Sequence, residues 1–152
     1  MLNAIFIFGA RDLIFLVIFL AGIYFLRQPR ARQKQLIIFG LSVAVISFIL
    51  SRIFASLYFD PRPFVENHFV PLVPHGPDNG FPSDHTLLSA VIASVFYKFS
   101  KKAGLALWAA ALFIGISRVY VGVHHPVDIL ASIAIAMTAS LLVYPWVKKN
   151  YF

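Results

Sequence analysis

The residues that could do chemistry lie in three short polar segments of an otherwise apolar chain. The segments read DPRP at 60–63, PSDH at 82–85 and SRVYVGVHHPVD at 117–128. The first and third carry an arginine, Arg62 and Arg118, and guanidinium groups bind phosphate oxygens through paired, charge-assisted hydrogen bonds. Because histidines stand close by in the sequence, this combination predicts a bound polyanion, and a phosphate fits it best.

The PSDH segment predicts the start of a helix that faces the ligand. Ser83 is a favoured N-cap residue, so the following helix should direct free backbone N–H groups and its positive dipole end toward an anion. His85 would lie in the first turn of this helix. From there it could donate a proton to an oxygen that leaves the phosphorus.

The third segment predicts an oriented nucleophile. Pro126 suits the first position of a helix, which places Asp128 in the first turn. Asp128 follows His124 by four residues, close enough to accept a hydrogen bond from one ring nitrogen of the histidine. The other ring nitrogen would then turn its lone pair toward the phosphate.

Composition indicates the environment of these segments. The chain has 152 residues, of which 60% are apolar and 12% charged, and its mean hydropathy is +0.82. Such values are typical of a membrane protein, and the length supports a single domain over residues 1–152. The lack of cysteine excludes disulfides, thiolate metal sites and cysteine nucleophiles. The net charge of +7 could suggest nucleic acid, but basic residues in so apolar a chain more often orient it in the bilayer, so no nucleic-acid partner is expected.

Five apolar stretches predict an all-α fold, a polytopic membrane bundle of about five transmembrane helices. They cover 4–26, 36–59, 85–99, 103–123 and 127–147, and Arg11 and Asp12 interrupt the first. Most of them approach the roughly 20 residues that a membrane span requires, whereas the third is short. Its polar first turn should lie at the membrane interface or against other helices.

Basic residues predict the orientation in the membrane. Nine of the thirteen fall at three sites that alternating spans place on one face, which the positive-inside tendency assigns to the cytoplasm. All six acidic residues and all five histidines fall toward the other face. The sequence therefore predicts an active site facing outside, an outer N-terminus and an inner C-terminus. The nine residues are Arg27, Arg30, Arg32, Lys34, Lys98, Lys101, Lys102, Lys148 and Lys149.

A long connection over residues 60–84 carries six prolines and should form an outer loop. A loop of this length in a compact protein is usually functional, often a lid, although a passive surface loop is the simpler alternative. The other features also have ordinary explanations. A serine before a helix can be only a cap, and the two arginines could pair with Asp60, Asp84 or Asp128 without any ligand.

In combination and order, the three segments resemble the motifs of the type 2 phosphatidic acid phosphatase superfamily, which are K-x6-RP, PSGH and SR-x5-H-x3-D. The third motif is complete in this sequence. The first retains its Arg-Pro pair, and the second retains its proline, serine and histidine. The motif residues fall within 52–128.

The resemblance implies specific functions for these residues. His124 would form a phosphohistidine and Asp128 would orient it, while His85 would protonate the leaving oxygen and later activate water. The resemblance implies neither a metal nor another cofactor. The residues implied to bind the phosphoryl oxygens are Arg62, Ser83 and Arg118.

Two positions depart from the family pattern. The lysine of the first motif is replaced by Ala55, and Arg52, one helical turn away, could either reach the phosphate in its place or form a structural ion pair. Asp84 stands where the second motif has glycine. Its negative charge is unfavourable beside a phosphate unless it points away or pairs with Arg62 or Arg118.

The PSDH form resembles the bacterial bacitracin-resistance branch, which hydrolyses undecaprenyl diphosphate. The sequence therefore predicts a phosphatase of the bacterial plasma membrane that removes the terminal phosphate of this lipid as it is recycled for cell-wall synthesis. The nearest alternative is a phosphatidylglycerophosphate or phosphatidate phosphatase of broad lipid specificity. A non-catalytic lipid-phosphate binder or transporter subunit is disfavoured because binding alone does not need the histidine–aspartate pair. The hydropathy excludes a soluble haloperoxidase, which shares the motif set.

Overall fold

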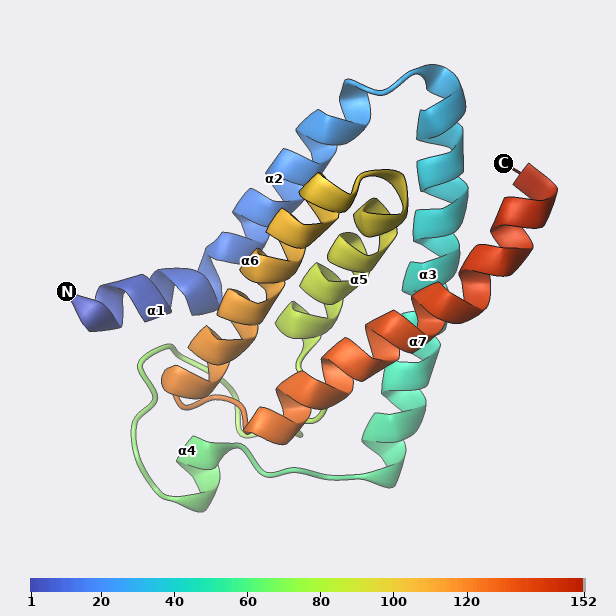
Figure 1. The fold of residues 1–152 in the computed structure, drawn as a ribbon. Coiled ribbons are helices and arrows are strands. Elements are labelled where there is room, and N and C mark those ends of the chain that lie inside the picture. Colours follow the sequence, from blue (N-terminus) through green and yellow to red (C-terminus); the bar gives the residue numbers. More distant parts are fainter. Residues whose placement is uncertain (152) are drawn as a thin grey trace.

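The structure is a computed structural model that describes residues 1–151, and helices are the regular elements of this part of the chain. The predicted all-α fold is confirmed. The seven helices are α1 (Leu2–Arg11), α2 (Leu13–Leu26), α3 (Arg30–Leu57), α4 (Pro63–Glu66), α5 (Asp84–Phe99), α6 (Lys101–Tyr120) and α7 (Pro126–Tyr151). Figure 1 shows them as a bundle in which α5 lies between α6 and α3.

Three of these helices, α3, α6 and α7, are long and apolar enough to cross a membrane by themselves. The predicted first span is two helices, α1 and α2, which meet at a bend of 55° and reach the same length and apolarity only as a pair. The charged residues that interrupted this stretch stand at the bend, where Arg11 Nε bonds Asp12 Oδ1 at 2.9 Å. The chain is therefore a multi-pass membrane protein with three such helices, or four if the bent pair is one span.

The short α5 is the central helix of the bundle. It packs against α6 and α7 most extensively and also against α3 and α2, so its small residues Ala90 and Ala93 are fully buried. The turn into α6 brings the two helices so close that a Cβ on Gly104 would collide with the Tyr97 backbone. This helix is therefore enclosed by neighbouring helices along much of its length.

The polar segments all arrive at one end of the bundle. The C-terminal ends of α3 and α6 and the N-terminal ends of α5 and α7 lie there, together with α4 and the long loop (Figure 1). The α2–α3 turn, the α5–α6 turn and the C-terminal end of α7 lie at the opposite end. The three basic sites are therefore separated from the polar segments by the length of the bundle, as the sequence predicts.

Helix α1 lies across the end of α6 that bears the polar segments. The Phe6 ring stacks on Tyr120 with ring centroids 4.0 Å apart, and the Tyr120 hydroxyl donates to Asn3 Oδ1 at 2.8 Å. Gly9 faces Ser117 closely enough that a Cβ would collide with its side chain. This contact places the backbone of α1 beside Arg118.

Candidate active site

The polar segments enclose one cavity of about 290 Å³ at this end of the bundle. Its walls contain six of the eight predicted site residues. The other two, Ser83 and Asp128, are fully buried behind the wall. The lining residues are Arg52, Ala55, Arg62, His75, Asp78, Asn79, Phe81, Pro82, Asp84, His85, Arg118 and His124.

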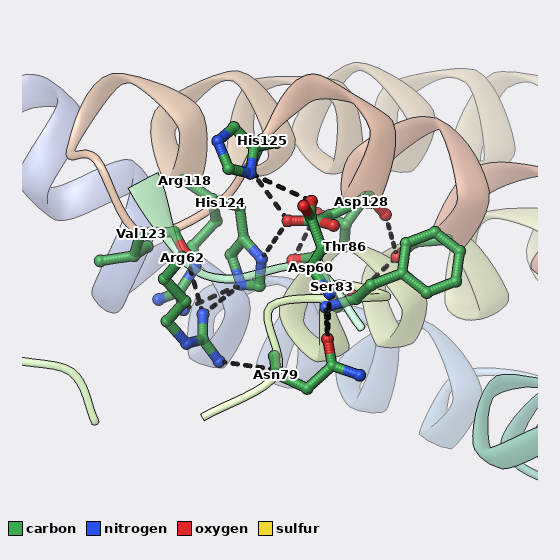
Figure 2. A network of polar contacts seen from close by, with 12 residues as sticks. Asp60, Arg62, Asn79, Ser83, Thr86, Arg118, Val123, His124, His125 and Asp128 are labelled. Atoms are coloured by element: carbon green, nitrogen blue, oxygen red, sulfur yellow. Dashed lines mark hydrogen bonds and ion pairs between the residues drawn. The ribbon is translucent and has the colours of Figure 1, made fainter. Parts of the chain in front are cut away.

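The predicted pair of His124 and Asp128 is present and almost fully buried (Figure 2). Pro126 is the first residue of α7, so Asp128 lies in the first turn, where its Oδ2 is 3.0 Å from His124 Nδ1. Gly122 makes the turn before the histidine at a φ of +82°, a conformation that favours glycine. The hydrogen bond holds the Nδ1–H tautomer, which leaves the Nε2 lone pair directed into the cavity.

Both arginines point at that nitrogen. Arg62 Nη1 and Arg118 Nη2 each lie 3.3 Å from His124 Nε2. The guanidinium groups are fixed from behind, because Arg62 donates to the carbonyl of Val123 at 2.8 Å and Arg118 donates to the carbonyl of Ala10 at 3.2 Å. Two buried cations therefore converge where an oxyanion bonded to Nε2 would lie.

This environment sets the protonation of the histidine. Burial lowers the pKa of His124, and the charges of Arg118 and Arg62 lower it further, whereas the hydrogen bond to Asp128 opposes the shift. The net direction favours the neutral imidazole at physiological pH. A neutral ring with an unprotonated Nε2 is the form that can act as a nucleophile.

Among the described residues, neither Arg62 nor Arg118 forms the ion pairs considered above, which were with Asp60, Asp84 or Asp128. Arg62 pairs with Asp78 of the long loop, with Nε and Oδ1 2.8 Å apart, and this hydrogen bond lowers the pKa of Asp78. Of the two arrangements considered for Asp84, the structure has the one in which its side chain does not pair with Arg62 or Arg118. Asp84 Oδ1 lies 3.1 Å from Arg52 Nη2, and both side chains are largely exposed. Asp84, the second departure from the family pattern, is therefore paired with Arg52, one helical turn from the first departure at Ala55.

Ser83 precedes α5 as predicted, but its side chain accepts no capping hydrogen bond from the helix backbone. It is fully buried, and its hydroxyl accepts instead from Thr86 Oγ1 at 3.2 Å. Its carbonyl accepts from the Ser132 hydroxyl of α7 at 2.9 Å. The serine therefore joins α5 to α7, while His85 in the first turn of α5 faces the cavity.

The long loop supplies cavity residues that sequence reasoning missed. The His75 ring lies 6.3 Å from the His124 ring, and its pKa is lowered by burial and by the charges of Arg62 and Arg118. Asn79 accepts from the backbone N–H groups of Asp60 and Phe81, which fixes the loop against the end of α3. The loop is thus part of the site rather than a passive surface. Its polar residues His75, Asp78 and Asn79 are the signal that could have indicated this.

Known proteins resemble this chain in sequence. The sequence pattern of the PAP2 superfamily matches residues 35–152. The chain is 36% identical to the undecaprenyl-diphosphatase BcrC of Bacillus subtilis (strain 168) over 89% of this chain and 66% of that protein. It is 32% identical to the bacitracin transport permease protein BcrC of Bacillus licheniformis over 100% of this chain and 75% of that protein.

Solved structures share the fold as well. The crystal structure of Aquifex aeolicus LpxE superimposes with a TM-score of 0.72 and 25% identity over 95% of this chain and 86% of the other. A transmembrane PAP2 type phosphatidylglycerolphosphate phosphatase from Bacillus subtilis superimposes with a TM-score of 0.63 and 28% identity over 98% of this chain and 78% of the other. The family pattern, the curated relatives and the fold agree. The chain belongs to the PAP2 superfamily and is a membrane lipid phosphatase of that family.

Proposed function

We propose that this phosphatase hydrolyses the terminal phosphate of undecaprenyl diphosphate through a phosphohistidine on His124. The observation that carries the proposal is His124 itself, whose Nδ1 is held by Asp128 and whose Nε2 lies 3.3 Å from each of two buried guanidinium groups. The lipid is suggested by relatives named undecaprenyl-diphosphatase, BcrC of Bacillus subtilis and, at 35% identity, the putative enzyme YbjG of Escherichia coli (strain K12).

In the first step, His124 Nε2 attacks the terminal phosphorus and the bond to the bridging oxygen breaks. Arg62 and Arg118 stabilise the charge on the transferring oxygens, and Asp128 stabilises the imidazolium that forms. His85, which faces the same cavity, gives its proton to the bridging oxygen, so the lipid leaves as a monophosphate. In the second step His85 takes a proton from water, the water attacks phosphorus, and the P–N bond breaks to release phosphate.

The proposal is tested by the choice of substrate. Purified protein would be given undecaprenyl diphosphate, phosphatidylglycerophosphate and phosphatidate in turn, and released phosphate would be measured. We expect kcat/KM for undecaprenyl diphosphate to exceed the others by about tenfold or more. The second candidate is a phosphatidylglycerophosphate phosphatase, favoured by 28% identity to phosphatidylglycerophosphatase B of Bacillus subtilis. If the protein prefers phosphatidylglycerophosphate, that lipid becomes the proposed substrate in place of undecaprenyl diphosphate. Failure to hydrolyse any of the three lipids would favour a lipid-phosphate binder.

The exposed Arg52 is expected to support binding of the phosphate. It replaces the motif lysine on the cavity wall, so Arg52→Ala should lower kcat/KM by about tenfold, equivalent to about 1.4 kcal/mol. Ala55→Lys in the same variant should recover part of the loss, because position 55 also lines the cavity. Arg27→Ala, at the other end of the bundle, is the control. Full activity in a well-folded Arg52→Ala would mean that Arg52 serves only its ion pair with Asp84.

The acid limb of the pH profile should report His124. Since burial and two cations lower its pKa below the ordinary 6.5, kcat/KM should rise with pH through a limb below 6.5. Asp128→Asn removes a group that favours the charged imidazole, so this limb should move by about one unit toward acid while kcat falls. Because both proteins are assayed with the same substrate, the difference between their acid limbs must come from ionisable groups of the enzyme. Asp12→Asn should leave the limb in place, and a shift toward alkaline pH in Asp128→Asn would contradict the assignment.

The active site is expected to face outward in the bacterial plasma membrane, with the N-terminus outside and the C-terminus inside. The basic sites at the opposite end of the bundle support this orientation. In this cysteine-free chain, Val70→Cys in the exposed part of the loop should react with an impermeant thiol reagent in intact cells. Arg32→Cys should react only after the cells are permeabilised. The reverse pattern would place the active site in the cytoplasm.

A further inference from the structure

A second polar cluster lies directly behind the pair of His124 and Asp128. It joins Asp60, from the segment after α3, to His125, which precedes α7 (Figure 2). Asp60 Oδ2 lies 3.0 Å from His125 Nδ1, and the backbone N–H of His125 donates to Asp128 Oδ2 at 2.9 Å. His125 Nε2 is 3.4 Å from Glu66 Oε2 of α4. This cluster touches the carboxylate that orients His124 but does not line the cavity.

The carboxyl groups of Asp60 and Asp128 are buried and close together. Asp60 is 8% exposed and Asp128 is not exposed, and one oxygen of each lies with a His125 nitrogen inside a group whose atoms are all within 4.8 Å of one another. Two negative charges this close together in a buried site are strongly unfavourable. Burial and then the charge of Asp128 raise the pKa of Asp60, while the charge of His125 and its hydrogen bond oppose the shift. A proton retained on Asp60 removes the repulsion.

One atom of Asp128 needs a donor. Oδ2 accepts from His124 and from the backbone of His125, whereas Oδ1 is buried and has no hydrogen-bond partner among the ordinary donors of the described residues. A buried carboxylate oxygen without a donor costs free energy comparable to a lost hydrogen bond. A carboxylic acid on Asp60 would supply the missing donor.

We propose that Asp60 is a positioning residue of the active site, which stays protonated and donates its O–H to Asp128 while its carbonyl oxygen accepts from His125 Nδ1. This proposal rests on the proposed function, because it gives Asp60 a catalytic effect only through the orientation of His124 by Asp128. The two carboxyl groups then carry one negative charge between them. Asp128 is held by Asp60 and His125 in the position from which it bonds His124 Nδ1.

The test compares hydrogen-bonding groups. An amide has both a donor and an acceptor, as a carboxylic acid does, whereas a carboxylate has acceptors only. In Asp60→Asn the side-chain N–H donates to Asp128 and the carbonyl accepts from His125, so most of the turnover should survive. In Asp60→Ala both hydrogen bonds are lost, and kcat should fall by about tenfold or more while KM stays within about twofold, because the cavity cations are untouched. Full activity in Asp60→Ala, or an Asp60→Asn variant as impaired as Asp60→Ala, would overturn the proposal.

A second measurement detects the proposed proton itself. Difference infrared spectroscopy of the wild-type protein at neutral pH should show the carbonyl band of a buried protonated carboxyl group, and Asp60→Asn should lack it. Absence of the band from the wild-type protein overturns the proposal. Dialysis against a chelator should leave activity unchanged. A loss that a divalent cation restores would show that the three residues hold a metal instead of a proton.

His124→Ala, assayed in parallel, separates this proposal from the proposed function. If His124→Ala is inactive while Asp60→Ala is fully active, only the assignment of Asp60 fails. If His124→Ala is itself fully active, the nucleophile assigned under the proposed function fails.

Discussion

His124→Ala is expected to abolish turnover, lowering kcat by about 10⁴-fold or more, as loss of a covalent nucleophile does in enzymes whose catalytic residues act as a unit. His124 Nε2 lies 3.3 Å from Arg62 and 3.3 Å from Arg118. Among the described residues, no second nucleophilic nitrogen has hydrogen bonds to both of these arginines. The affinity for inorganic phosphate or vanadate should remain largely intact, because the binding cations are still present. The measurements are steady-state kinetics and competition binding.

A histidine elsewhere in the loop provides the control for this variant. His68 is exposed and has a φ of +53°, which asparagine tolerates, so His68→Asn should keep its activity. If His124→Ala folds and retains turnover near that of the wild-type protein, a covalent mechanism through this residue is wrong. Loss of phosphate affinity together with turnover would instead assign His124 to binding.

Arg62→Ala is expected to lower kcat/KM by about 100-fold or more. The Arg62 guanidinium is 5% exposed and is held by the Val123 carbonyl and by Asp78, so it is already oriented before the phosphate binds. Preorganised charges of this kind contribute more to the transition state than to the bound substrate. We therefore expect kcat to fall more than KM rises.

Arg62→Lys should recover only part of this loss. A single ammonium group cannot reproduce the planar fork that bonds Val123 and Asp78 and would still offer an N–H group to the proposed phosphate. Arg11→Ala, which removes an exposed arginine from α1, is the control for a general effect of charge. If a folded Arg62→Ala remains within about threefold of the wild-type kcat/KM, the arginine is structural and the proposed phosphate site needs another cation.

The sequence predicted the helices where apolar length and end signals agree. Pro126 begins α7 and Ser83 precedes α5, and α6 and α7 match their apolar stretches within four residues, whereas α3 begins six residues before its stretch. The bend between α1 and α2 depends on how α1 packs on α6 through Phe6 and Tyr120, a tertiary contact that has no periodic pattern in the sequence. Local chemistry therefore predicted the elements but not the angle between them.

The same division applies to the site. The bond between His124 and Asp128 follows from a spacing of four residues at a helix start, so the sequence could predict it. The partners of the arginines depend on the path of the long loop, which brings Asp78 to Arg62 across 16 residues, and on α3 facing α5, which brings Arg52 to Asp84. The contact of Asp60 with His125 spans 65 residues and was missed for the same reason.

The most direct test of the mechanism is to trap its covalent intermediate. A single turnover with lipid labelled in the terminal phosphate would be quenched and the protein digested. We predict label that is labile to acid and stable to base, on the peptide that contains His124, and no label on His124→Ala. Label on a serine or an aspartate, or label that persists in His124→Ala, would contradict the assignment of His124 as the nucleophile.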